Sequence, residues 1–165
     1  MKKNLLFLLF LICPFVFSQT YKVIGIKDGD TVSILMDGKE KTVRLAHIDC
    51  PEKKQPFGTK AKEAISELCF GKFVTLVGDG KTDRNGRLIA ELFLPNGVNV
   101  NKALLKMGLA WHFKKYSKDD SYATLEITAR NKKTGLWKDK NPIAPWNWRK
   151  MTKEQKANNS FSVYN

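Results

Sequence analysis

Two Asp-Gly pairs divide the stretch YKVIGIKDGDTVSILMDGKEKTVRL, residues 21–45, into segments rich in β-branched and large apolar residues. Asp-Gly supplies the positive φ angles that tight hairpin turns require. Apolar residues alternate at Val32, Ile34 and Met36 and again at Val43 and Leu45, which is the pattern of strands with one buried face. The stretch therefore predicts successive short strands joined by hairpins.

The same pattern continues further along the chain. Turn pairs recur at Asp79-Gly80, Asn85-Gly86 and Asn96-Gly97, with more β-rich segments beside them. The expected strands are Tyr21–Ile26, Thr31–Met36, Thr42–Ile48, Phe73–Val77 and Leu88–Leu94. Several short strands with hairpin turns favour a small barrel.

Helical periodicity marks three further segments, each followed by a glycine. These segments are Thr59–Cys69, Val100–Met107 and Asp119–Lys133. Prolines and tryptophans in Asn141–Arg149 predict an extended strap laid on the domain, and the polar residues after Lys150 are expected to fray. The sequence thus predicts a mainly β domain with about three helices.

Length and charge narrow the class of protein. The chain has 165 residues, of which 42% are hydrophobic and 27% charged, as in one globular domain with a core. These proportions exclude collagen-like, coiled-coil and multi-span membrane classes. Lys and Arg number 29 against 16 Asp and Glu, a net charge of +13. Such an excess predicts a polyanionic partner, with nucleic acid first and an acidic membrane surface second.

The N-terminal residues read as a targeting segment. Two lysines precede an apolar run from Leu5 to Phe17, which is too short to span a bilayer. A basic start and a short apolar run are typical of a secretory signal peptide, here 1–18 with cleavage near Ser18. The sequence therefore predicts export to the periplasm or the medium. A buried strand, an uncleaved anchor and lipid attachment at Cys13 are the alternatives.

Acidic residues gather in one part of this basic chain. Asp28 and Asp30 flank a turn glycine. Asp49 and Glu52 follow the third expected strand, on which Arg44 lies. Carboxylates with loop carbonyls suit a hard cation such as Ca²⁺, and the planar fork of arginine matches two phosphate oxygens. Each piece alone would be structural, but their combination indicates phosphodiester hydrolysis.

Aromatic and cationic residues alternate from Trp111 to Tyr116. This pattern suits a channel for a single nucleic-acid strand, where bases stack and phosphates pair. The alternative is that Trp111 and Phe113 close the core while Lys114 and Lys115 are solvated. Tyr116 is the aromatic residue most expected to contact substrate.

The cysteines and histidines suggest two weaker hypotheses. His47, Cys50, Cys69 and His112 do not have the close spacing of metal ligands, which disfavours zinc. Cys50 and Cys69 would both remain after export, so a disulfide between them is an open hypothesis.

Short motifs follow one another in a fixed order between Tyr21 and Trp137. They are Asp28-Gly29-Asp30-Thr31, Arg44-Leu45, Ile48-Asp49-Cys50-Pro51-Glu52, Asp83-Arg84-Asn85-Gly86-Arg87, Gly108-Leu109-Ala110 and Gly135-Leu136-Trp137. This ordered series resembles the thermonuclease family, of staphylococcal or micrococcal nuclease type. The resemblance implies an OB-fold barrel of five strands with three helices. It also implies Ca²⁺-dependent cleavage of DNA and RNA that leaves 3′-phosphate ends.

The same resemblance implies roles for individual residues. The metal would lie on Asp30, Asp49 and the backbone carbonyl of Cys50, with Asp28 nearby. The catalytic residues would be Arg44 and Arg87, which clamp phosphate, and Glu52, which orients or deprotonates the attacking water. Arg84 and Tyr116 are further candidates for substrate binding.

The expected organisation is a signal peptide (1–18), a monomeric nuclease domain (19–138) and a C-terminal extension (139–165). Two rival functions remain open. One is a non-catalytic OB-fold module that holds single strands without cutting them. The other is an adhesion or envelope protein that binds acidic lipid or polysaccharide through its basic face.

Overall fold

The computed structural model describes residues 19–161, and its centre is a closed barrel. Its strands, in order around the barrel, are β1 (Thr20–Asp28), β2 (Thr31–Met36), β3 (Lys39–Leu45), β6 (Leu88–Phe93) and β5 (Phe73–Val77). Neighbouring strands are antiparallel except β3 and β6, which are parallel. The expected OB-fold barrel is confirmed. The expected signal peptide lies outside the described residues.

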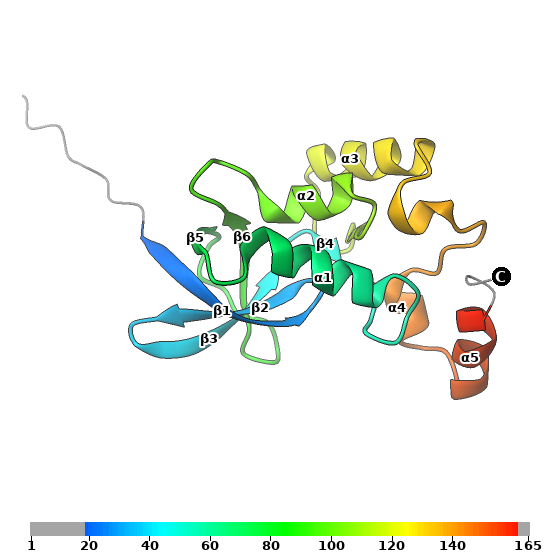
Figure 1. The fold of residues 1–165 in the computed structure, drawn as a ribbon, viewed down its shortest axis with the longest axis horizontal. Helices are drawn as coiled ribbons and strands as arrows, with labels where there is room; N and C mark the ends of the chain where they lie inside the picture. The colour runs from blue at the N-terminus through cyan, green and yellow to red at the C-terminus, as the bar shows by residue number, and fades with distance from the viewer. Residues whose placement is uncertain (1–18, 162–165) are drawn as a thin grey trace, which may run out of the picture.

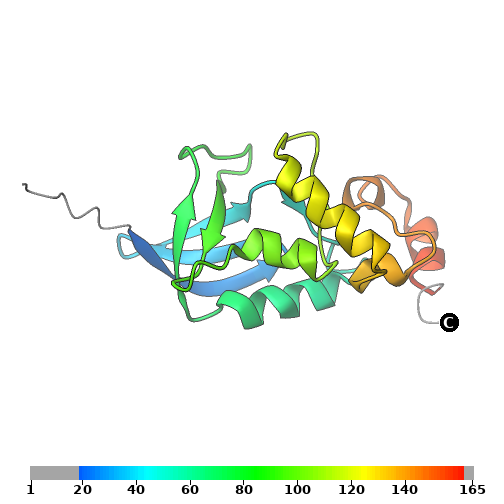
Figure 2. The ribbon, with the colours of Figure 1, turned by 90° about the horizontal axis from the view of Figure 1, so that it is seen from above.

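Helices cover one side of the barrel and one end of the molecule (Figure 1). They are α1 (Gly58–Cys69), α2 (Val100–Lys106), α3 (Asp120–Asn131), the 3-10 helix η1 (Gly135–Lys138), α4 (Pro145–Trp148) and α5 (Lys153–Phe161). Helix α1 packs on β1, and α2 packs on β6 and α3. Helices α4 and α5 lie at the end of the molecule away from the start of β1 (Figure 2). Over residues 19–161, no helix has the length and apolar character to cross a membrane.

Two apolar clusters hold these elements together. The first fills the barrel, where the alternating residues Val32, Ile34 and Val43 are fully buried. Burial of each such side chain stabilises the fold by about 1.5–3 kcal/mol. The second cluster contains Trp111, Ala129, Leu136, Trp137 and Ala144. Because Ala144 belongs to the second cluster, the C-terminal segment is docked on the domain.

One expected strand is divided in two. The expected strand Thr42–Ile48 ends as β3 at Leu45, and β4 (Ile48–Asp49) begins after a turn in which His47 has a φ of 68°. Strand β4 pairs with β7 (Trp111–His112) and not with the barrel. Because the residue with positive φ is a histidine and not a glycine, the sequence carries no turn signal at this point.

The expected extended strap is wrong in its second half, which forms helix α4. Pro145 occupies the first turn of the helix, where its fixed φ is already helical and its missing N–H has no cost. The Trp148 N–H donates to the Ala144 carbonyl at 2.9 Å. The proline therefore begins a short helix in a segment that the sequence pattern indicated to be extended.

The expected fraying after Lys150 is wrong for Lys153–Phe161, which form α5, and residues 162–165 lie outside the described residues. The start of α5 is a reciprocal capping box. The Thr152 hydroxyl accepts from the Gln155 N–H at 3.2 Å, and the Gln155 side-chain oxygen accepts from the Thr152 N–H at 2.9 Å. These two bonds satisfy backbone donors at the helix start, which makes a helix of this polar sequence favourable.

Candidate active site

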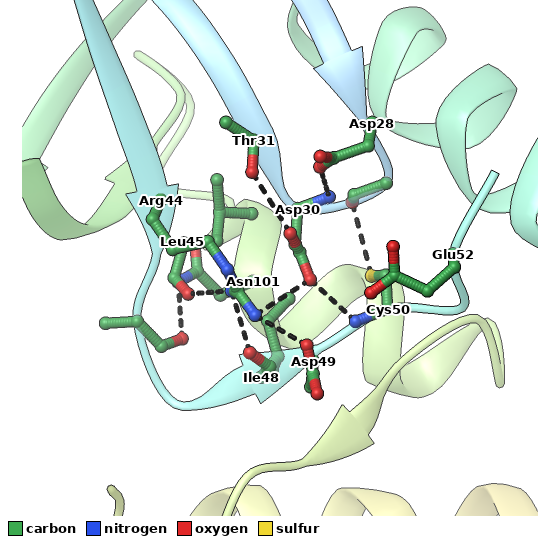
Figure 3. A network of polar contacts seen from close by, with 12 residues as sticks. Asp28, Asp30, Thr31, Arg44, Leu45, Ile48, Asp49, Cys50, Glu52 and Asn101 are labelled. Atoms are coloured by element: carbon green, nitrogen blue, oxygen red, sulfur yellow. Dashed lines mark hydrogen bonds and ion pairs between the residues drawn. The ribbon is translucent and has the colours of Figure 1, made fainter. Parts of the chain in front are cut away.

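Two of the predicted acidic residues, Asp30 and Asp49, contact the guanidinium of Arg44 (Figure 3). Arg44 Nη2 lies 3.0 Å from Asp30 Oδ2 and 2.7 Å from Asp49 Oδ1. Both carboxylates are buried, Asp49 with only 1% of its surface exposed. The Asp28 carboxylate accepts from the Asp30 N–H at 3.1 Å and so shapes the β1–β2 turn. The turn, β3 and β4 therefore bring one guanidinium and two buried carboxyl groups together.

Arg44 also closes the turn that places Asp49. Its Nη1 donates to the carbonyl of Leu45 at 2.7 Å and to that of Ile48 at 2.9 Å. The Leu45 N–H donates to the Asp30 carbonyl at 2.8 Å, which ties the end of β3 to the β1–β2 turn. One side chain thus fixes the backbone that carries Asp49 and neutralises the carboxylate itself.

Asn101, which sequence reasoning missed, forms a hydrogen bond to the backbone of this turn. It is fully buried on α2. Its Nδ2 donates to the Ala46 carbonyl at 2.9 Å, and its Oδ1 accepts from the Leu92 N–H at 3.1 Å. In sequence, an asparagine within a short helical pattern gives no sign that it is buried against a distant turn.

Burial dominates the electrostatics of the cluster. Burial raises the pKa of Asp30 to about 7; Arg44 opposes this rise, while Asp28 and Asp49 add to it. Burial alone would lower the pKa of Arg44, but Asp30 and Asp49 raise the pKa above its usual value. Negative charge thus gathers around one guanidinium, so a second cation would be stabilised here.

Cys50 contributes a backbone N–H to the cluster and does not form a disulfide. Its N–H donates to Asp30 Oδ2 at 2.7 Å, and its thiol donates to the Gly29 carbonyl at 3.2 Å. The Cys69 thiol donates to the Ile65 carbonyl at 3.1 Å, and both cysteines are free and buried. Both cysteines are free, so this structure does not contain the disulfide that the sequence left open.

Glu52 has a partner that sequence reasoning missed. Arg149, directly after α4, places Nη1 2.6 Å from Glu52 Oε1 and Nη2 2.7 Å from Asp49 Oδ2. The Asp49 carboxylate therefore has Arg44 at one oxygen and Arg149 at the other. The prolines and tryptophans before Arg149 indicated that this segment docks, but nothing in the sequence indicated where.

Arg87 is linked to the cluster through one hydroxyl. Its Nη2 pairs with Asp83 at 2.6 Å, and its Nη1 donates to Thr31 Oγ1 at 3.4 Å. That hydroxyl donates to Asp30 Oδ1 at 3.2 Å. The structure therefore brings Arg87 to the side of Asp30 opposite the Cys50 amide contact at Oδ2.

A groove of about 1730 Å³ joins these groups to the remaining candidates. Arg84 and Tyr116 line the groove, both are exposed, and Tyr116 packs edge-on against Phe113. Trp111 also borders the groove, but it is buried and belongs to the second apolar cluster. The two alternatives for the aromatic run are therefore both realised in part: Trp111 belongs to the core, and Tyr116 belongs to the groove.

The oxygen donors suit a hard cation in their chemistry, since the carboxyl groups of Asp30 and Asp49 are both buried here. Within residues 19–161, however, no three His, Cys, Asp or Glu side chains form a group that could hold a metal ion as they stand. The charge of the Asp49 carboxylate is neutralised by the guanidinium groups of Arg44 and Arg149. The assignment of metal to Asp30, Asp49 and the Cys50 carbonyl stays a prediction.

Comparison with known proteins places this site in a family. Residues 42–139 match the family model described as Staphylococcal nuclease homologue. The chain is 43% identical over 136 residues to an uncharacterized endonuclease of Haemophilus influenzae. The aligned region covers 82% of this chain and 75% of that protein. It is 37% identical over 142 residues to a micrococcal nuclease of Shigella flexneri, which covers 80% and 81% of the two chains.

A barrel of this type with an acid–arginine cluster in its groove, matched over most of the chain to nucleases, defines a phosphodiester hydrolase that acts on nucleic acid. Within that class, the chain belongs to the staphylococcal nuclease family. The matched range contains Arg44, Asp49, Glu52 and Arg87. Arg149 lies beyond it.

Proposed function

We propose that this nuclease is an exported, monomeric, Ca²⁺-dependent endonuclease that cleaves DNA and RNA and leaves 3′-phosphate ends. One observation carries the proposal: the buried carboxylates of Asp30 and Asp49 share the guanidinium of Arg44 in the groove that Glu52 lines. Burying two carboxyl groups against one guanidinium is costly, so a site that keeps them indicates a use for them.

Arg44 and Arg87 are the phosphate clamps of the proposed reaction. Both guanidiniums line the same groove, and both are connected to Asp30, directly for Arg44 and through Thr31 for Arg87. Phosphoryl transfer is accelerated mainly by positive charge that is already in place when charge develops on the phosphate oxygens. Two arginines held by partners on different strands meet that requirement.

Glu52 is the proposed general base. Its carboxylate is half-exposed at the groove, where it can reach a water molecule. The water oxygen forms a bond to phosphorus as Glu52 takes a proton from that water, and the bond from phosphorus to the 5′ oxygen breaks. The leaving 5′ oxygen takes a proton from solvent, which yields a 3′-phosphate and a 5′-hydroxyl.

Asp30, Asp49 and the Cys50 carbonyl are the residues that would hold Ca²⁺. The ion, when bound, would polarise a phosphate oxygen and make bound water more acidic. The raised pKa of Asp30 supports this assignment, because a cation would replace the proton that burial otherwise favours there.

A single-stranded or frayed substrate suits the groove. Tyr116 is exposed and offers an aromatic ring on which a base can stack, and Arg84 is exposed in the same groove. Because the chain carries a net charge of +13, binding should weaken steeply as salt is added.

The deciding experiment digests DNA and RNA with purified residues 19–165, in Ca²⁺ and in EGTA. We expect cleavage of both polymers with Ca²⁺ alone, and new ends that accept label at the 5′ position without phosphatase treatment. Equal cleavage in EGTA, or 5′-phosphate ends, would contradict the proposal. Binding without cleavage in either condition would favour the non-catalytic OB-fold module.

Export has a separate test. The full-length chain should release a product whose first residue is Gln19 into the periplasm or the medium, as read by N-terminal sequencing of each fraction. A product that keeps residues 1–18 in the membrane fraction would favour an uncleaved anchor.

A further inference from the structure

The C-terminal segment reaches the centre of the active site through one side chain. Arg149 bridges Asp49 and Glu52, which lie 100 and 97 residues earlier in the chain. Within the part of the chain that the structure describes, the Glu52 carboxylate forms an ion pair with Arg149. Burial would lower the pKa of Arg149, but its hydrogen bonds to the two carboxylates raise that pKa above the usual value. The Arg149 side chain therefore stays positively charged at every working pH.

A buried amide ties the loop of Glu52 to the segment of Arg149. Gln55 is 6% exposed. Its Oε1 accepts from the Glu52 N–H at 3.1 Å, and its Nε2 donates to the Ile143 carbonyl at 2.6 Å. The backbone that carries Glu52 and the backbone that leads to Arg149 are therefore joined a second time, independently of the ion pairs.

Aromatic packing fixes the helix that precedes Arg149. Trp148 is 3% exposed. The Trp146 ring stacks on Phe113 with an interplanar angle of 3° and meets Trp111 edge-on. The Arg149 N–H donates to the Pro145 carbonyl at 3.0 Å. A guanidinium held by a docked helix costs less entropy to keep in place than one on a loose tail.

We propose that Arg149 is a positioning residue of the active site: it holds the Glu52 carboxylate beside Asp49, and docking of α4 with the Gln55 bridge keeps it there. The inference rests on the role of Glu52 in the proposed function. It makes Ile143–Arg149 part of the nuclease site and not an accessory extension.

An ordinary surface ion pair would not have this effect. Exposed pairs contribute little to stability, because water and salt screen them and their side chains lose entropy when they are held together. Here one partner, Asp49, is 1% exposed, and both oxygens of its carboxylate are engaged. Loss of Arg149 would leave the Glu52 carboxylate free to turn among rotamers, which lowers the fraction of molecules with the base in place.

The test compares Arg149→Ala with Lys153→Ala, a loss of the same charge at an exposed position of α5. We expect Arg149→Ala to lower kcat by about 10- to 100-fold, as for partners that orient catalytic groups. KM should change by less than about threefold, and melting in EGTA should remain cooperative. Lys153→Ala should keep the wild-type kcat. Low, non-denaturing concentrations of guanidinium ion should partly restore the kcat of Arg149→Ala alone.

A double-variant cycle shows whether Arg149 acts through Glu52. In a Glu52→Gln background, Arg149→Ala should cost little further activity. An equal fold loss in both backgrounds, a rise in KM without loss of kcat, or faster turnover by Arg149→Ala would each overturn the inference. Wild-type turnover by Glu52→Gln would instead overturn the proposed role of Glu52, so the two failures are distinguishable. Arg149→Lys, which keeps the charge without the fork, is the second variant if Arg149→Ala does not fold.

Discussion

The first residue of α1, Gly58, lies directly against the carbonyl of Glu52, so that a Cβ at position 58 would stand 1.9 Å from that oxygen. The Gln55 N–H donates to the same carbonyl at 2.8 Å, and the Gly58 N–H donates to the Gln55 carbonyl at 2.9 Å. The start of the helix therefore forms one wall of the loop that presents the proposed base. Only glycine fits this contact without moving Glu52.

Gly58→Ala should therefore damage stability and activity together. Overpacking of this kind costs about 1–3 kcal/mol, and relief by moving the Glu52 loop would misplace the carboxylate. The free energy of unfolding from urea titration and the kcat on DNA should both fall. Thr59→Ala, at the next and exposed position, is the matched control and should change neither. Normal turnover by Gly58→Ala would show that the loop position is not critical.

Glu52→Gln should abolish most turnover and leave the fold intact. The amide oxygen can still accept from Arg149, but the side chain can no longer take a proton from water. Loss of a general base lowers the rate by about 10²- to 10⁴-fold. Steady-state kcat and thermal melting are the measurements. A variant that cleaves DNA as fast as the wild type would refute the assignment.

Arg87→Ala and Arg84→Ala should separate transition-state charge from substrate binding. Arg87 is held by Asp83 and Thr31, so its loss should lower kcat by about 10²- to 10³-fold, as for other fixed donors to developing charge. Arg84 is exposed on the same loop, so its loss should mainly raise KM and reduce the dependence of binding on salt. Equal effects of the two changes on kcat would contradict the distinction.

The stability of the metal-free protein should fall as pH rises from about 4 to 7. Asp30 has a pKa of about 7 in the folded protein and an ordinary pKa of 3.8 in the unfolded chain. Between these two values, folded Asp30 keeps a proton that unfolded Asp30 has released. The folded state therefore binds more protons, and the free energy of unfolding decreases with pH. Carboxyls with lowered pKa, such as Asp83, lose their stabilising contribution only at more acidic pH.

Asp30→Asn isolates this effect. In EGTA the variant should lose the slope that Asp30 causes, and added Ca²⁺ should raise the melting temperature of the wild type but not of the variant. Asp37→Asn, on the exposed β2–β3 turn, is the control and should behave as the wild type in both respects. An unchanged slope for Asp30→Asn would refute the raised pKa, and a full Ca²⁺ response would refute the metal assignment.

The strands and hairpins could be predicted because their signals are local. Asp-Gly turns and alternating residues such as Val32 and Ile34 specify hairpins within a few residues, and the barrel confirms them. The turn at His47 could not be predicted in this way, since its positive φ falls on a histidine and its flanking carbonyls are bonded by the side chains of Arg44 and the distant Asn101. The capping box at Thr152 was a local signal, and it was missed.

By itself, the sequence determined which residue types the nuclease site contains, because Asp30, Arg44, Asp49, Glu52 and Arg87 occur in motifs that can be read within short windows. Only the tertiary structure determined which other side chains contact them. Arg149 meets Glu52 across 97 residues of chain, because aromatic packing docks α4 beside the site. Contacts at such separation depend on how whole elements pack, and no local pattern of residues encodes that.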